Sequence, residues 1–440
     1  MPNPSANDLK DPAWQVKALS TSAAELAHRG LLEEATKIYE QILQAAPYHV
    51  QALDFLATRA YERGDTNLSL VLLGRSYRAS RDRPITCLNL GVVHKARGEY
   101  ELALDALDRA LSLQAVYPMA LLHKGSILEA LGRQQEAVRA YHKAWIQAPE
   151  YQQKLRSEQI PAPVRELLSH SADTIRRARV TLLDKALAPL RSQHYAATIQ
   201  RAAEFAELYV GNIMPRYTHA MQRPAFLYFP GLQPHAFFER QNFDWVVELE
   251  AATASIRQEL RAVLEQPEVL KPYVQLDTPD PAQWKELNNS PQWSSFHLYK
   301  AGERQTAHCN QCPITAAIVE KLPLVYTQNH SPEIFFSILK PGTHIPPHYG
   351  LANYKLAVHL PLIVPADCTI RVGNESRSWT EGQCLIFDDS FQHEAWNNSS
   401  ELRAVLILEV WNPQLSLAEQ QAVVAVLSTI REFEREYGSG

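Results

Sequence analysis

Two segments decide the fold: Pro-Gly-Thr-His-Ile-Pro-Pro-His-Tyr-Gly at residues 341–350 and Phe-Asp-Asp-Ser-Phe-Gln-His-Glu-Ala-Trp at residues 387–396. Each contains a histidine, His348 or His393, near the expected end of a short β-strand. Most of the 16 histidines in the chain need no functional explanation, but neutral imidazoles are good ligands for Fe(II). The pair therefore predicts an iron site whose open positions would admit O2 and a co-substrate.

A glycine occupies the position that usually supplies a third iron ligand. The common site of two histidines and one carboxylate has Asp or Glu two residues after the first histidine, where this chain has Gly350. Glycine has no side chain that could bind a metal, so a water would have to fill this place. Asp389 is a candidate to hold that water by a hydrogen bond, although Asp388 and Asp389 could instead cap a turn.

Three further side chains could hold an oxo-acid co-substrate. The planar fork of Arg403 suits a carboxylate, and strand alternation allows it to point inward. Ser337 could add a hydroxyl to the same carboxylate. His359 alternates with Lys355 on one expected strand, so the two share a face. Each of these residues is weak evidence alone.

Short alternating segments fill the last third of the chain. Six strands are expected, and turns at Pro-Gly, Pro-Ala-Asp, Gly-Asn and Glu-Gly separate several of them. The strands span 333–340, 354–363, 369–372, 377–379, 384–387 and 403–410. Strands this short and evenly spaced predict a double-sheet jelly roll. A final segment, 415–437, predicts an amphipathic helix that packs outside it.

The first third contains an internal repeat. Gly30, Gly64, Gly98 and Gly132 follow one another at intervals of 34 residues. A small residue comes five positions after each glycine and a large one nine positions after it. This spacing predicts helix–turn–helix units that stack into a solenoid, with the glycine in the turn and the large residue filling the gap between repeats. Stacked repeats commonly hold a peptide or protein on a concave face, and the alternative is a purely structural scaffold.

The chain therefore divides into three expected parts: a repeat domain at 15–150, a helical capping or linker region at 151–222, and a mixed domain at 223–440. Within the linker, residues 173–188 predict a helix that Pro189 interrupts. This is an α+β multidomain chain of 440 residues, with an all-α solenoid before a β-rich domain.

Composition narrows the classes of partner. The net charge is −5 with no long run of one sign, which argues against nucleic acid as the main partner. The chain has no window of 18 consecutive apolar residues and no signal-peptide pattern at its start, so neither a membrane span nor secretion is expected, and a cytoplasmic location follows. Of the five cysteines, only Cys309 and Cys312 are closely spaced. One such pair cannot supply four zinc ligands, and chance or a local redox-sensitive pair explains it better.

From about residue 228 to 413 the chain resembles the aspartyl/asparaginyl β-hydroxylase family of Fe(II)- and 2-oxoglutarate-dependent oxygenases. The motifs that carry the resemblance are Leu-Tyr-Phe-Pro-Gly-Leu at 227–232, Phe-Ser at 336–337, the two histidine segments, and Glu-Val-Trp-Asn-Pro at 409–413. This family is known to lack the iron-binding carboxylate and to carry His-x-Gly instead. Gly350 therefore supports the resemblance.

The resemblance implies roles for five residues. His348 and His393 match the two iron ligands, and Ser337, His359 and Arg403 match positions that hold 2-oxoglutarate. It also implies a double-stranded β-helix (a jelly-roll or cupin-like fold) for the oxygenase domain. The repeats resemble tetratricopeptide repeats, which precede the oxygenase domain in the animal enzymes and help to bind the protein substrate there.

The expected activity is hydroxylation of a carbon, the β-carbon first, of an Asp- or Asn-like residue in a peptide or protein. Two departures put the substrate in doubt: Ala357 and Lys355 stand where the enzymes acting on epidermal-growth-factor-like domains have arginines. Losing one buried cation would alter recognition of an acidic group by about 2 kcal/mol. Two alternatives remain. One is hydroxylation of a free amino acid, a carrier-bound amino acid or a lipid acyl chain, and the other is a non-catalytic adaptor built on the repeats.

Overall fold

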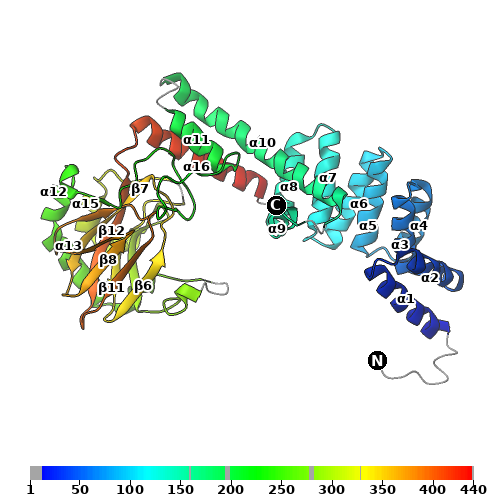
Figure 1. Cartoon of the computed structure of the whole chain (residues 1–440), viewed down its shortest axis with the longest axis horizontal. Coiled ribbons are helices and arrows are strands. Elements are labelled where there is room, and N and C mark those ends of the chain that lie inside the picture. Colours follow the sequence, from blue (N-terminus) through cyan, green and yellow to red (C-terminus); the bar gives the residue numbers. More distant parts are fainter. Residues whose placement is uncertain (1–11, 158–159, 194–198, 277–281, 328, 439–440) are drawn as a thin grey trace. The chain divides into compact units, whose positions relative to one another are not determined.

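The computed structural model describes residues 12–157, 160–193, 199–276, 282–327 and 329–438 (Figure 1). The described chain divides into two compact units. The repeat unit comprises residues up to Ala178 together with those from Phe433, and the two-sheet unit comprises Arg179–Glu432. The expected boundaries at residues 150 and 222 stay predictions.

Consecutive helix pairs build the repeat unit (Figure 1). The helices are α1 (Pro12–His28), α2 (Leu32–Ala45), α3 (Val50–Glu62), α4 (Thr66–Ala79), α5 (Pro84–Ala96), α6 (Tyr100–Leu113), α7 (Pro118–Ala130) and α8 (Gln134–Gln147), followed by α9 (Tyr151–Leu155) and α10 (Ala162–Gln193). The four predicted turn glycines have φ between +73° and +83°, the left-handed conformation that glycine adopts without steric cost. The helix–turn–helix prediction is confirmed.

The large repeat residues fill close contacts inside each helix pair. A Cβ atom on Gly125 of α7 would lie 2.4 Å from Cε1 of Tyr141 on α8, and one on Gly91 of α5 would lie 2.7 Å from Cγ of Leu107 on α6. A second glycine in each of these repeats thus makes room for the large side chain of its own pair. The expected stop at Pro189 is wrong, because α10 continues through it to Gln193.

Two antiparallel sheets form the centre of the two-sheet unit. The larger runs in the order β1-β10-β7-β12-β5-β3-β2, with β4 paired to β3, and the smaller in the order β6-β11-β8-β9. The larger sheet consists of β1 (Phe237–Phe238), β2 (Lys271–Pro272), β3 (Trp293–Lys300), β4 (Glu303–Arg304), β5 (Ile334–Leu339), β7 (Lys355–Ile363), β10 (Leu385–Phe387) and β12 (Arg403–Trp411). The smaller consists of β6 (Thr343–His348), β8 (Cys368–Val372), β9 (Glu375–Ser378) and β11 (His393–Asn397).

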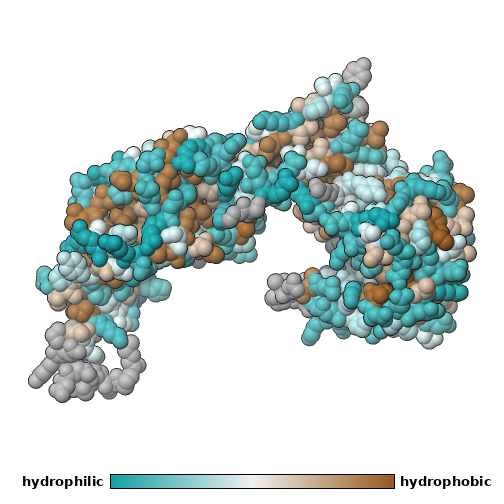
Figure 2. Space-filling model, turned by 180° about the vertical axis from the view of Figure 1, so that it is seen from behind, coloured by the Kyte–Doolittle hydropathy of each residue, from teal (hydrophilic) through white to brown (hydrophobic). Residues whose placement is uncertain are grey.

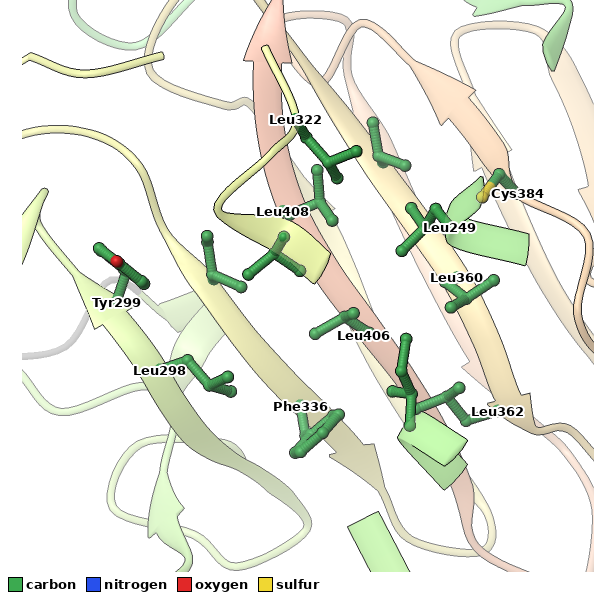
Figure 3. Packing of buried hydrophobic residues seen from close by; sticks show 14 of the residues in the cluster. Leu249, Leu298, Tyr299, Leu322, Phe336, Leu360, Leu362, Cys384, Leu406 and Leu408 are labelled. Carbon is green, nitrogen blue, oxygen red and sulfur yellow. The ribbon is translucent and has the colours of Figure 1, made fainter. Parts of the chain in front are cut away.

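Helices cover the outer face of the larger sheet. These are α12 (Val246–Ala251), α13 (Thr253–Leu264), α14 (Thr306–Gln311) and α15 (Pro313–Val319), and they share one hydrophobic cluster with the strands. Figure 3 shows Leu360, Leu406 and Leu408 of the strands in this cluster with Leu249 of α12. Cys309 and Cys312 are buried in the same cluster as free thiols. Burial raises the pKa of both thiols, which does not favour a redox-sensitive pair.

The inner face of the larger sheet lies against the smaller sheet. Leu339, Ala357 and Phe387 from the larger sheet share a cluster with Ile345 and Ala395 from the smaller one. Because side chains alternate along a strand, residues 355, 357 and 359 of β7 face this inner layer while 356, 358 and 360 face the helices. The two-layer arrangement therefore places alternate residues of β5, β7 and β12 between the sheets.

A third cluster joins helices to the chain that leads into the sheets. It contains α11 (Gln200–Tyr209) and α16 (Leu417–Gly438), with Leu227, Phe229 and Tyr354 packed among them. The predicted C-terminal helix is thus present. Short 3-10 helices occur at Arg240–Asn242, Pro267–Val269 and Ala282–Trp284.

The surface mixes polar and apolar residues. Figure 2 shows hydrophobic residues of the repeat unit interspersed with hydrophilic ones on the face in view. Tyr48, Val71 and Val116 are each more than half exposed, which is ordinary for isolated apolar side chains. Among the described helices, none is long and apolar enough to cross a membrane.

Candidate active site

His348 and His393 lie opposite each other on two neighbouring strands of the smaller sheet. His348 ends β6, His393 begins β11, and the two are partners in the antiparallel register. Their ring centroids are 4.0 Å apart. The Nδ1 atom of His348 lies 2.8 Å from the carbonyl oxygen of Pro346, and that of His393 lies 2.9 Å from the carbonyl oxygen of Phe391. A carbonyl can only accept, so each Nδ1 carries the proton and each Nε2 keeps a free lone pair.

Both imidazoles are held in the neutral form. Burial lowers the pKa of His348 below its ordinary value. Burial, followed by the neighbouring His348, lowers the pKa of His393 well below that value. Two neutral imidazoles with free Nε2 atoms form a donor set that suits a divalent transition metal.

Gly350 cannot be replaced by a residue with a carboxylate without rearrangement. A Cβ atom at this position would lie 2.1 Å from Cγ of Asp389, and the Gly350 N–H donates to the Asp389 carbonyl oxygen at 2.6 Å. Asp389 therefore fills the space beside Gly350. In the part of the chain that the structure describes, no three His, Cys, Asp or Glu side chains gather as a metal site.

The Asp389 carboxyl group is itself unusual. Its Oδ1 atom is buried and has no hydrogen-bond partner among the described residues. Burial raises the pKa of Asp389 to about 7, with Lys355 opposing and Glu409 adding to the shift. A buried carboxyl oxygen without a partner is the kind of atom that an ordered water satisfies.

Arg403, the first residue of β12, is a buried cation. Its side chain is 1% exposed, and its guanidinium carbon lies 4.8 Å from the centre of the Trp379 ring. Its Nε and Nη1 atoms have no hydrogen-bond partner within the described ranges. Burial lowers the pKa of Arg403 to about 10, so the group still carries its charge at neutral pH. A charge buried without an ion-pair partner destabilises a protein unless something else supplies that partner.

Ser337 and His359 lie on the strands either side of β12. In the sheet register, Ser337 of β5 is opposite Val405 and His359 of β7 is opposite Ile407. The indole N–H of Trp293 donates to Oγ of Ser337 at 3.1 Å, which leaves the hydroxyl proton free to donate. The indole N–H of Trp379 donates to Nδ1 of His359 at 3.3 Å. The sheet thus places Ser337, His359 and Arg403 on adjacent strands of one inner face.

Lys355 is already paired inside the protein. Its ammonium group bonds the Glu409 carboxylate and lies 3.3 Å from Oγ of Ser331. Burial opposes its charge, but the carboxylates of Glu409 and Asp389 outweigh burial and raise the pKa of Lys355. Across the sheet Glu409 is the register partner of Ala357. Lys355 occupies one of the two positions where the related enzymes have arginines. Its charge is therefore already paired with Glu409, the residue opposite Ala357.

Three residues that touch the site escaped the reasoning from sequence. The alternation of Trp293 with Ser295 and His297 along the chain was a signal for its inward indole. Trp379 follows β9 and Glu409 lies within β12, and neither shows a local pattern that marks it. Their roles depend on the pairing between strands far apart in sequence.

Comparison with known proteins identifies similarities in the same region of the chain as the candidate site. Residues 250–413 match the family described as Aspartyl/Asparaginyl beta-hydroxylase, and residues 85–117 match Tetratricopeptide repeat. The human "Aspartyl/asparaginyl beta-hydroxylase" is 40% identical over 141 residues, which cover 32% of this chain and 18% of that protein. The "Ornithine lipid ester-linked acyl 2-hydroxylase" of Rhizobium tropici is 35% identical over 184 residues, which cover 41% of this chain and 62% of that protein. The chain therefore matches less than two thirds of the length of either relative.

A solved structure is also similar to part of the chain. It is a thermophilic TPR protein of Thermus thermophilus, 21% identical, which covers 38% of this chain and 84% of that chain with a TM-score of 0.28. These family similarities rest on the sequence matches, and the helix pairs and the two sheets agree with them. Residues 250–413 are thus similar to the aspartyl/asparaginyl β-hydroxylase family, and residues 85–117 are similar to a tetratricopeptide repeat.

Proposed function

We propose that the chain is an Fe(II)- and 2-oxoglutarate-dependent hydroxylase with a double-stranded β-helix as its catalytic domain. The observation that supports this best is the buried guanidinium of Arg403, whose Nε and Nη1 atoms lack partners among the described residues. A carboxylate of 2-oxoglutarate would supply that partner in a charge-assisted, two-point interaction. Ser337 and His359 on the neighbouring strands offer an O–H and an N–H to the same group.

His348 and His393 are the proposed iron ligands, through their free Nε2 atoms. Each ring is fixed by a hydrogen bond from Nδ1 to a backbone carbonyl, as metal-binding histidines commonly are. When bound, iron supplies the redox chemistry by which O2 oxidises 2-oxoglutarate to succinate and carbon dioxide and leaves one oxygen atom for a substrate C–H bond.

The rest of the site binds, orients and excludes water. Arg403, Ser337 and His359 fix the co-substrate carboxylate, and the indoles of Trp293 and Trp379 hold two of these donors in place. Asp389 is proposed to hold a water beside Gly350 through its unpartnered Oδ1 atom. In the common site of two histidines and one carboxylate, the carboxylate is the third ligand, and this water would take its place.

The proposed substrate is an Asn- or Asp-like residue of a peptide or protein, hydroxylated at Cβ and presented by the repeats. The inner face favours an uncharged side chain over a carboxylate. Lys355 is paired with Glu409, and Glu409 is the register partner of Ala357. An acidic side chain beside Ala357 would meet this carboxylate, whose nearby cation is already engaged.

A second candidate is hydroxylation of a lipid acyl chain or of a free or carrier-bound amino acid. The 35% identity to a relative named as an acyl 2-hydroxylase favours the lipid version. The two candidates share the iron and co-substrate site and differ only in the group offered to it.

The decisive experiment measures succinate formed from 2-oxoglutarate by the full chain with added Fe(II), and searches by mass spectrometry for products heavier by one oxygen atom. Peptides that differ only in Asn, Asp or Leu at one position, and vesicles containing an acyl-ornithine lipid, separate the substrate classes. His348→Ala and His393→Ala should each abolish turnover. Arg261→Met, which removes an exposed arginine of the same unit, is the control and should not. Absence of turnover together with absence of anaerobic 2-oxoglutarate binding would refute the proposal in favour of an adaptor.

A further inference from the structure

We propose that Trp379 is a positioning residue for the co-substrate carboxylate, which fixes the ring proton of His359 on Nε2 and supports the guanidinium of Arg403. This inference rests on the proposed function. It also makes a statement about the protein alone, because the position of a proton on His359 can be measured without any ligand.

The hydrogen bond between Trp379 and His359 determines the tautomer. Indole N–H is only a donor, so the Nδ1 atom of His359, 3.3 Å away, must carry its lone pair toward it. The two rings lie nearly parallel, at 15°, and both side chains are buried. Burial and the charge of Arg403 oppose a second proton, and the pKa of His359 is lowered to about 3. A neutral His359 with an acceptor at Nδ1 has its single N–H at Nε2, and that N–H is what a carboxylate needs.

The same indole lies against the guanidinium of Arg403. The distance of 4.8 Å from the guanidinium carbon to the ring centre falls within the range of a cation–π interaction. Because Nε and Nη1 of Arg403 lack hydrogen-bond partners in the described chain, the indole is a main restraint on this side chain. The Trp379 ring therefore fixes which nitrogen of His359 carries the proton and restrains the guanidinium of Arg403. A shift of this ring would affect both side chains.

The surroundings of Trp379 restrain its side chain. It follows directly after β9 and is 6% exposed within the cluster between the sheets. A bridge between Thr380 and Gln383 closes the turn that comes next. A cavity of about 150 Å³ borders the indole and is also lined by Arg240 and Arg377. Truncation of Trp379 would extend this cavity toward His359 and admit water there.

Trp379→Phe removes the N–H while keeping an aromatic ring beside Arg403. The matched control is Trp396→Phe. Trp396 stacks on the half-exposed His344, and its ring lies on the side of β11 that faces away from the site. The first measurement is nitrogen-15 NMR of histidine-labelled full chain without metal, with the His359 signal identified by its loss in His359→Gln. In the wild type we expect only the Nε2–H tautomer, and in Trp379→Phe a mixture of both. The control should keep the wild-type pattern.

The second measurement is anaerobic calorimetry of 2-oxoglutarate binding with Mn(II) in place of iron, followed by steady-state kinetics. We expect Trp379→Phe to weaken binding and to raise KM for 2-oxoglutarate by about tenfold, the loss of one oriented hydrogen bond, with kcat little changed. Trp396→Phe should leave both within about twofold.

A wild-type His359 protonated at Nδ1 would overturn the inference without any variant, and so would a Trp379→Phe chain that keeps both the wild-type tautomer and the wild-type affinity. Trp379→Tyr, which also lacks the indole N–H, answers the same question if the phenylalanine variant does not fold. Failure of the wild type to bind 2-oxoglutarate would refute the proposed function instead, and the tautomer measurement would still decide the assigned role of Trp379 toward His359.

Discussion

A buried carboxylate of the repeat unit and two buried charged side chains of the two-sheet unit differ in whether the protein itself supplies their partners. In the repeat unit, the buried carboxylate of Asp54 accepts hydrogen bonds from Ser76 and Thr86 and lies 3.1 Å from Arg83. In the two-sheet unit, Nε and Nη1 of Arg403 on the inner face of the larger sheet, and Oδ1 of Asp389 in the turn after β10, are buried without such partners among the described residues. A buried carboxylate that serves the fold alone has its partners within the protein. Under the proposed function, the unsatisfied atoms between the sheets lower the stability of the ligand-free chain, and a bound co-substrate supplies their partner.

Breaking the ion pair between Lys355 and Glu409 on the inner face should have the largest effect. Lys355→Met leaves the Glu409 carboxylate buried without its ammonium partner. We expect the free energy of unfolding to fall by about 3–5 kcal/mol, measured by urea denaturation of the full chain. The double substitution Lys355→Met/Glu409→Leu should recover most of this loss, because it removes both charges. Lys321→Met, which breaks an exposed pair with Glu248, should cost about 0–1 kcal/mol. An equal cost for both lysines would mean that the inner pair is not buried in solution.

Arg403→Met should separate binding from stability. The substitution removes an unpaired buried charge, so the unfolding free energy of the ligand-free chain should stay the same or rise by about 1 kcal/mol. Anaerobic binding of 2-oxoglutarate should weaken by about 100-fold, near 2.7 kcal/mol, because the co-substrate carboxylate loses its cation. Arg133→Met, which removes an exposed partner of Glu136, controls for loss of an arginine. A strong loss of stability with unchanged binding would assign Arg403 to the core.

The two units also differ in how much of them the sequence reveals. The repeat is a local code: a glycine with positive φ ends one helix, and the residues five and nine positions later pack within the same pair. Every contact of that kind lies within about one repeat length, so periodicity alone predicts it. The course of α10 through Pro189, a residue of the two-sheet unit, does not follow from such a local code, because the packing of a long helix outweighs the local breaker.

In the two-sheet unit the sequence indicates the donors but not their partners. His348, His393 and Arg403 could be named from residue type and strand alternation. The pairing of Lys355 with Glu409, and of Trp379 with His359, joins residues 54 and 20 positions apart in sequence. Which of them meet depends on strand register, and a shift of one residue would turn each side chain to the other face.

A third prediction tests close packing in the repeat unit. A methyl group on Gly125 would lie 2.4 Å from the buried ring of Tyr141, so Gly125→Ala should lower the free energy of unfolding by about 1–3 kcal/mol. Gly74 lies in α4 with open space around its Cβ position. Gly74→Ala should therefore raise the free energy of unfolding by about 0.5–1 kcal/mol, because alanine favours the helix. Thermal unfolding of both variants gives the comparison, and the same sign for both would contradict it.

The last prediction concerns acid. In the repeat unit, burial and then Lys95 lower the pKa of His123 to about 4. The folded chain therefore resists a proton that the unfolded chain accepts near its ordinary value, so the contribution of a neutral His123 to stability is complete above pH 6.5. That contribution is lost as the pH falls from about 6.5 toward 4, with a slope on the order of 1 kcal/mol per pH unit. His123→Gln should flatten the dependence of unfolding free energy on pH in this window, while His28→Gln at an exposed position controls for loss of a histidine. A slope that persists in His123→Gln would contradict this assignment. The acid sensitivity would then belong to other histidines with lowered pKa values, such as His49 in the repeat unit, whose pKa burial and Arg83 lower, or His359 in the two-sheet unit, whose pKa burial and Arg403 lower to about 3.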